Sequence, residues 1–116
     1  MNSSKSTKTK PLSEKRAPLP RASDRTKEFK NDWQRLSNSG RYDMKALRAV
    51  MTLLINNDGP LPAQHNDHDL TGEWQDHREC HIGGDFLLIY RLSGTKKDEA
   101  VVFTRAGTHA ELFKKC

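Results

Sequence analysis

All five histidines of this 116-residue chain lie in its C-terminal half, close to Asp67, Asp69, Glu79 and Asp85. The histidines are His65, His68, His77, His81 and His109. Imidazole groups titrate near neutral pH, so they are well suited to act as general bases and general acids. This clustering of imidazoles and carboxylates predicts acid/base chemistry.

The clearest local pattern is a predicted strand at residues 77–82. Alternation along a strand places His77, Glu79 and His81 on one face. Two glycines follow and predict a turn, so a hairpin would bring Asp85 back beside the end of that strand and near His81. A carboxylate beside an imidazole can fix which ring nitrogen carries the proton.

RNA cleavage without a metal or cofactor needs three groups, because the RNA 2′-hydroxyl is itself the nucleophile. A base takes the hydroxyl proton, an acid protonates the leaving 5′-oxygen, and a cation stabilises the phosphorane. Imidazoles supply the first two groups, and Arg105 could supply the third. His109 and Phe113 lie four residues apart in a predicted helix, on one face, where an exposed ring could stack on a base.

Other interpretations of the polar segment remain open. His65 and His77 are expected to be ordinary surface residues. Asp67, His68 and Asp69 could be loop residues whose side chains bond the neighbouring backbone.

Other interpretations also remain open for the C-terminal candidates. Phe113 could close the core, and Arg105 could be half of a surface ion pair of little energetic value. Trp33, Trp74 and Tyr90 are expected in the core without a role in function.

Two helices are predicted ahead of this segment. Ser23 or Asp24 can cap a first helix in which apolar residues recur at helical spacing until residues 39–40. Asp43 can cap a second helix with a wide apolar stripe, which ends at residues 56–60. A short edge strand at residues 19–23 would precede them.

Short strands follow the helices. They are expected at residues 70–74, 77–82, 86–92 and 100–104, and Thr108 with Glu111 forms a capping box that opens a short final helix. Residues 86–92 are apolar on both faces, as in a central strand. The order predicts an α+β fold with two helices packed on one face of a mainly antiparallel sheet of four to five strands.

Charge is concentrated at the N-terminus. Residues 1–28 hold eight Lys or Arg against three acids, a net of +5, whereas residues 29–116 hold twelve of each. Residues 1–17 have almost nothing to bury and are expected to be a disordered basic leader, with one domain at 18–116. With no apolar run after the N-terminal lysines, a cytoplasmic protein without a membrane partner is expected, and Cys80 and Cys116 are expected as reduced thiols.

The order and spacing of several motifs in residues 29–113 resemble the YafQ branch of the RelE bacterial toxins. The stretches that carry this resemblance are MTLLINN (51–57), Leu61-Pro62-Ala63, Asp67-His68, Leu70, Gly72, Trp74, Arg78, His81, Asp85, LLIYRL (87–92), Arg105, Gly107-Thr108-His109-Ala110 and Leu112-Phe113. The loop between residues 92 and 101 is longer than usual for that family, and the basic leader is also a departure.

The resemblance implies a microbial RNase fold and a type II toxin that cleaves mRNA on the translating ribosome. It also implies a cognate antitoxin, with operator DNA contacted only by the toxin–antitoxin complex. The family's functional residues fall on His68, His81, Asp85, His109 and Phe113.

The resemblance bears on three further positions in RNA binding. Arg105 matches a basic position that helps bind phosphate, and Glu79 stands where close relatives have Asp. Arg78 is the third expected RNA-binding residue.

Two other functions remain open on the sequence. A metal-dependent hydrolase could use His65, Asp67 and His68 as ligands, because histidines at i and i+3 can converge on an ion. Alternatively, the chain could be a catalytically decayed toxin that binds an antitoxin or takes part in DNA binding.

Overall fold

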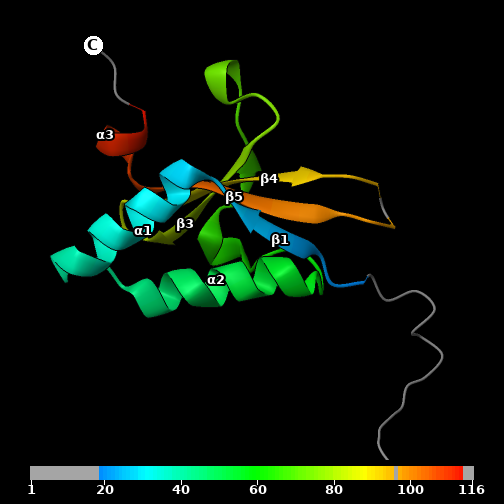
Figure 1. Cartoon of the computed structure of the whole chain (residues 1–116), viewed down its shortest axis with the longest axis horizontal. Coiled ribbons are helices and arrows are strands. Elements are labelled where there is room, and N and C mark those ends of the chain that lie inside the picture. The colour runs from blue at the N-terminus through cyan, green and yellow to red at the C-terminus, as the bar shows by residue number, and fades with distance from the viewer. Residues whose placement is uncertain (1–18, 96, 114–116) are drawn as a thin grey trace, which may run out of the picture.

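The computed structural model describes residues 19–95 and 97–113 (Figure 1). Its elements are β1 (Ala22–Arg25), α1 (Lys27–Ser39), α2 (Met44–Asn56), β2 (His68–Asp69), β3 (Arg78–Gly83), β4 (Phe86–Ser93), β5 (Ala100–Thr108) and α3 (His109–Leu112). The expected basic leader and Cys116 lie outside the described residues. Within the described part of the chain, no helix combines the length and apolar character needed to cross a membrane.

The five strands form one sheet in the order β1-β5-β4-β3-β2. β1 pairs in parallel with β5, and all the other pairs are antiparallel. The predicted α+β fold is therefore confirmed, and so is an N-terminal edge strand. That strand begins at Ala22, after Pro18 and Pro20, because proline lacks the N–H that a strand donates.

Both long helices start at side-chain caps. The Thr26 hydroxyl accepts a hydrogen bond from the Phe29 N–H, so the predicted cap at Ser23 or Asp24 is wrong; both residues lie in β1. The Asp43 carboxylate accepts from the Ala46 N–H, as predicted. These caps replace bonds that the first helical turn cannot make internally.

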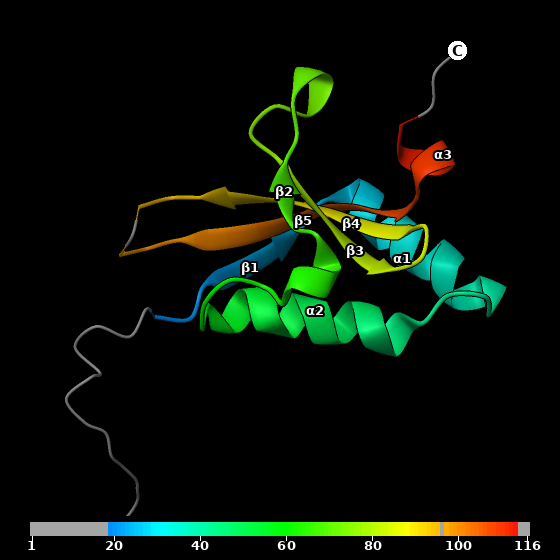
Figure 2. The ribbon, with the colours of Figure 1, turned by 180° about the vertical axis from the view of Figure 1, so that it is seen from behind.

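α1 and α2 pack on one face of the sheet, and we call this face of the sheet the helix face (Figure 2). The main core lies between the two helices and the helix face. It joins the buried stripes of α1 and α2 to sheet residues that include Cys80, Leu88, Tyr90 and Phe103. Burial raises the pKa of the Cys80 thiol well above its ordinary value, as expected for an unreactive core cysteine. The predicted packing of two helices on one face is confirmed.

The opposite face carries a smaller apolar cluster of Leu87, Ile89 and Leu112. Trp74 and Phe113 pack against it and are only partly buried. The predicted strand at residues 70–74 is wrong: only His68–Asp69 pairs with β3, and Gly72–Trp74 is a 3₁₀ turn. Gly72 has a φ of 69°, which ends the extended backbone.

The last elements follow prediction with one difference. β5 continues to Thr108 instead of ending at residue 104, and it leads directly into α3. Thr108 and Glu111 form the predicted capping box. This direct connection fixes His109 at the end of the sheet.

Candidate active site: three imidazoles around a buried carboxylate

Strand register brings His68, His81 and His109 to Glu79 on the face opposite α1 and α2. His68 of β2 lies directly opposite Glu79 of β3. His81 follows two residues later, on the same side of β3 as Glu79. His109 joins them from the start of α3. Residues far apart in the chain thereby form one cluster.

Glu79 is the centre of this cluster. Its side chain is only 4% exposed, and its Oε1 lies 3.0 Å from His68 Nε2 and 3.9 Å from His81 Nε2. Its Oε2 lies 3.8 Å from His109 Nε2 and has no hydrogen-bond partner among the described residues. Its position gives the three surrounding rings a common carboxylate partner, which orients them.

Both ring nitrogens of His68 face acceptors. Nδ1 lies 2.6 Å from the carbonyl oxygen of Asn66, and Nε2 faces Glu79. A carbonyl oxygen only accepts, so Nδ1 donates. The two contacts together fix the orientation of the His68 ring.

Asp85 holds His109 rather than His81, the partner expected from the hairpin. Its Oδ1 accepts from His109 Nδ1 at 2.8 Å and from the His109 backbone N–H at 3.3 Å. These bonds place the imidazole's free Nε2 toward Glu79. The hydrogen bond from the His109 side chain, with help from its backbone N–H, lowers the pKa of Asp85.

Aromatic rings border the cluster. The Phe113 ring centre lies 5.5 Å from that of His109, and Trp74 lies 6.2 Å from Phe113. His81 lies between His68 and His109, with ring centres 6.4 Å and 6.2 Å away. These consecutive ring contacts give an aromatic surface on which an unstacked nucleobase could stack.

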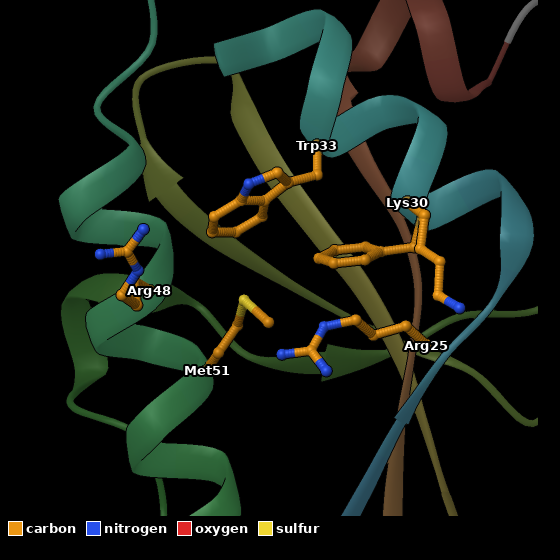
Figure 3. A pocket seen from close by; sticks show the side chains of 6 residues that line it. Arg25, Lys30, Trp33, Arg48 and Met51 are labelled. Carbon is orange, nitrogen blue, oxygen red and sulfur yellow. The ribbon is translucent and has the colours of Figure 1, made fainter.

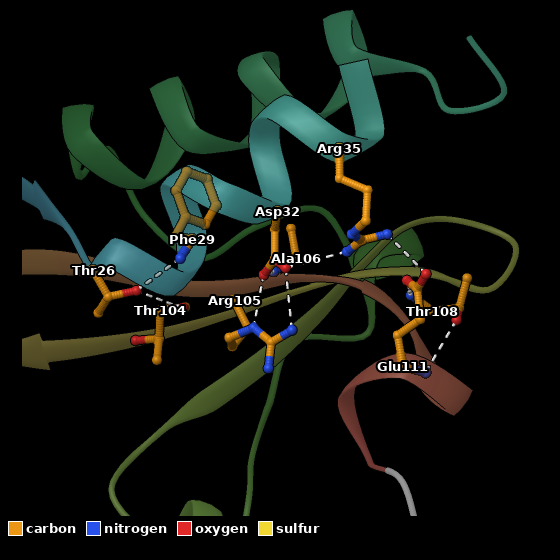
Figure 4. A network of polar contacts seen from close by, with 9 residues as sticks. All are labelled: Thr26, Phe29, Asp32, Arg35, Thr104, Arg105, Ala106, Thr108 and Glu111. Atoms are coloured by element: carbon orange, nitrogen blue, oxygen red, sulfur yellow. Dashed lines mark hydrogen bonds and ion pairs between the residues drawn. The ribbon is translucent and has the colours of Figure 1, made fainter. Parts of the chain in front are cut away.

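Arg105 is held by a residue that the sequence analysis missed (Figure 4). Asp32 of α1, which is 4% exposed, accepts from Arg105 Nε at 2.7 Å and from Nη2 at 3.1 Å. This pairing raises the pKa of Arg105 and leaves its Nη1 without a hydrogen bond among the described residues. The sequence does hint at Asp32, because this charged residue lies three residues after Phe29 and four before Leu36, on the buried stripe of α1.

Asp32 also supplies a hydrogen-bond acceptor to the backbone of β5. It accepts from the Ala106 N–H at 3.0 Å, beyond the point where β1 stops pairing with β5. Arg35 then links Asp32 to Glu111 of the capping box, at 3.1 Å and 2.8 Å (Figure 4). Through this network α1 supports both Arg105 and the helix that carries His109.

Arg78 is not brought to the cluster. It lies on the side of β3 opposite Glu79, where it contacts Asp67 at 2.9 Å and Asp69 at 2.6 Å. Tyr90, in the core as predicted, donates its hydroxyl to Asp67 and also contacts Arg78. The Asp67 contacts raise the pKa of Arg78, with burial opposing them, and the group ties the loop before β2 to the sheet.

His65 and His77 were both expected at the surface. The expectation is wrong for His65, which is 9% exposed and has its Nδ1 2.7 Å from the carbonyl oxygen of His81. His77 is half-buried and packs edge-on against Trp74. Neither ring joins the imidazoles around Glu79.

The alternative metal site requires His65, Asp67 and His68 to converge, and they do not. His65 contacts the His81 carbonyl, Asp67 contacts Arg78 and His68 contacts Glu79. Among the described residues, no three His, Cys, Asp or Glu side chains are arranged as metal ligands. The geometry gives this alternative no support.

A hollow of about 380 Å³ lies between α1 and α2 on the helix face (Figure 3). It is lined by Arg25, Phe29, Lys30, Trp33, Arg48 and Met51. The Arg48 guanidinium stacks over Trp33 at 5.6 Å from the ring centre. Trp33, predicted in the core, is partly buried at its edge. The sheet separates this hollow from the imidazole cluster.

Comparisons with known proteins agree with this fold. Residues 21–114 match the family model described as "Bacterial toxin of type II toxin-antitoxin system, YafQ". The "mRNA interferase toxin YafQ" of Escherichia coli is 46% identical over 79 residues, covering 68% of this chain and 82% of that protein.

Solved structures also match. The toxin in the E. coli DinJ–YafQ complex is 40% identical with a TM-score of 0.69, covering 80% of this chain and 98% of that one. A metal-bound toxin from Helicobacter pylori is 34% identical with a TM-score of 0.69, covering 79% and 98%. The chain therefore belongs to the YafQ family of bacterial toxins of type II toxin–antitoxin systems.

Proposed function

We propose that this toxin is an endoribonuclease that cleaves mRNA on the ribosome by metal-free acid/base chemistry. Membership of the YafQ family and 46% identity to an mRNA interferase toxin support the class of reaction. The observation that carries the mechanism is the set of three imidazoles around Glu79.

The imidazoles of His68, His81 and His109 supply the proton transfers. One imidazole removes the proton of the RNA 2′-hydroxyl, whose oxygen attacks the adjacent phosphorus. Another donates a proton to the departing 5′-oxygen. The products are a 2′,3′-cyclic phosphate and a 5′-hydroxyl, and no water is consumed in this step. Glu79 and Asp85 orient the rings.

Arg105 and Phe113 bind the substrate. Nη1 of Arg105 is available to contact the scissile phosphate while Asp32 holds the rest of the guanidinium. Phe113 stacks on a base beside His109, which fixes the backbone in line for attack.

The proposed partners are the translating ribosome with its mRNA and a cognate antitoxin. The DinJ–YafQ complex of a related toxin supports an antitoxin, and operator DNA would be contacted only within such a complex. A ribosome-bound substrate places the reaction in the cytoplasm.

The chemistry is tested by mapping the ends produced on programmed ribosomes. Wild-type protein should leave a 2′,3′-cyclic or 3′-phosphate and a 5′-hydroxyl. A single 2′-deoxynucleotide on the 5′ side of the cut should abolish cleavage there, because the nucleophile is missing. Cleavage of the deoxy-substituted mRNA, or 5′-phosphate ends, would instead indicate attack by water and contradict the mechanism. Antitoxin binding without any RNA cleavage would favour a decayed toxin.

A further inference from the structure

His65 is a buried polar side chain that the proposed reaction does not use. Its Nδ1 lies 2.7 Å from the carbonyl oxygen of His81. A carbonyl oxygen can only accept a hydrogen bond, so Nδ1 carries the hydrogen and donates it. The ring is therefore fixed in one orientation and one donor role.

Strand register explains why this carbonyl needs a side-chain donor. β2 pairs with β3 only through His68 with Glu79 and Asp69 with Arg78. Continued by two steps, that register would place Asn66 opposite His81. The chain has already turned there, because Ala63–His65 is a 3₁₀ turn and Asn66 has a φ of 46°. The His65 imidazole supplies a donor where the strand no longer does.

His81 has weak support from the other side as well. The pairing of β3 with β4 shifts register between His81 and Gly83. A register shift disrupts the ladder and changes the direction of side chains. An anchor on the His81 carbonyl therefore fixes the direction in which this imidazole projects.

The same turn orients a second imidazole. The Asn66 carbonyl accepts from His68 Nδ1 at 2.6 Å. Residue 65 thus anchors the backbone of His81, and residue 66 holds the ring of His68.

We propose that His65 is a positioning residue for the reaction, acting through its hydrogen bond to the His81 backbone without touching the RNA. This inference rests on the proposed ribonuclease function. It predicts that the donor itself matters, rather than the bulk of the ring. The substitution His65→Asn places an amide N–H close to the position of the imidazole Nδ1–H, whereas His65→Phe keeps a ring without a donor.

The test compares wild type, His65→Asn and His65→Phe, with His77→Phe as a matched control at a histidine outside the cluster. For His65→Phe, kcat on ribosome-bound mRNA should fall on the order of tenfold while KM stays within about twofold. His65→Asn should stay within about threefold of wild type. The imidazole NMR signals of His81 should shift in His65→Phe and return toward wild-type positions in His65→Asn.

Unchanged kcat or unchanged His81 signals in His65→Phe would overturn the proposal, and so would a His65→Asn variant as impaired as His65→Phe. If His65→Phe does not fold, ¹⁵N spectra of the wild-type protein test the hydrogen bond to the His81 carbonyl directly. A His65 ring that carries its hydrogen on Nε2 alone is incompatible with that bond and would overturn the proposal. A wild-type protein that cuts no ribosome-bound mRNA would contradict the proposed function, whereas the spectra would still test the anchoring of His81.

Discussion

The carboxylate of Asp32 in α1 holds the guanidinium of Arg105 in β5 through two hydrogen bonds of 2.7 Å and 3.1 Å. The same carboxylate caps the Ala106 N–H and contacts Arg35. A helix on one side of the sheet therefore fixes a cation proposed to bind phosphate, although the helix itself contributes no catalytic group.

Replacing Asp32 should destabilise the fold. Asp32→Ala leaves the Ala106 N–H without its acceptor and Arg105 without its partner, so the free energy of unfolding should fall by about 3 kcal/mol. Urea unfolding measures this change. Asp58→Ala, at an exposed carboxylate in the loop after α2, should stay within about 0.5 kcal/mol of wild type. Equal effects of the two substitutions would contradict the role of Asp32.

Arg105 and Arg78 were both predicted to bind RNA, but we expect Arg105 to contribute to cleavage and Arg78 to stability. Arg105→Gln should reduce cleavage of ribosome-bound mRNA by roughly tenfold or more, because a charge-assisted phosphate contact is lost. Arg78→Gln should chiefly lower stability, since its partners Asp67 and Tyr90 lie away from the cluster. Cleavage rates and urea midpoints of both variants check this separation. A larger catalytic loss in Arg78→Gln than in Arg105→Gln would reverse the assignment.

The bond to His109 should hold Asp85 ionised at unusually low pH. The pKa of Asp85 should lie below its ordinary value of 3.8 and rise toward it in His109→Ala. The stability that this bond contributes is therefore present above the unfolded-state pKa and is lost as pH falls through the lower folded-state pKa. Carboxyl ¹³C titration by NMR measures both values, with His77→Ala as control. A pKa for Asp85 that does not respond to His109→Ala is the contrary result.

Phe113 should contribute to substrate binding through its ring. Phe113→Leu keeps an apolar side chain against Trp74 but removes the stacking surface, so kcat/KM should fall by roughly tenfold. Leu53→Ala removes an exposed apolar side chain on α2, away from the cluster, and should leave the rate unchanged. Steady-state cleavage on programmed ribosomes gives both rates. Normal activity in Phe113→Leu would mean that Phe113 only packs against Leu112 and its neighbours.

Local patterns in the sequence predict much of the fold. Helical spacing and the Asp43 cap predict α2, alternation predicts β3, and the Thr108–Glu111 capping box predicts α3, because each depends on residues close together in the chain. The Thr26 cap is not predicted because Ser23 and Asp24 are equally good cap types and only the pairing of β1 with β5 decides between them.

The candidate site was predictable in composition but not in its connections. Residue types identified His68, His81, Asp85 and His109. Strand register places Glu79 at the centre of the cluster. The start of α3 at His109 brings His109, instead of the expected His81, to Asp85.

The supporting residues depend on still longer connections. Asp32 and His65 act on backbone groups 74 and 16 residues away. No local pattern shows such contacts.

The proposed mechanism is tested most directly by cleavage of an mRNA on programmed ribosomes by wild type, His81→Ala, His109→Ala and His77→Ala, with circular dichroism confirming that each protein is folded. We predict that wild type and His77→Ala cut the mRNA and leave a cyclic or 3′-phosphate and a 5′-hydroxyl. Folded His81→Ala and His109→Ala should lose at least about a hundredfold in rate. Cleavage at the wild-type rate by both His81→Ala and His109→Ala would contradict the proposed mechanism.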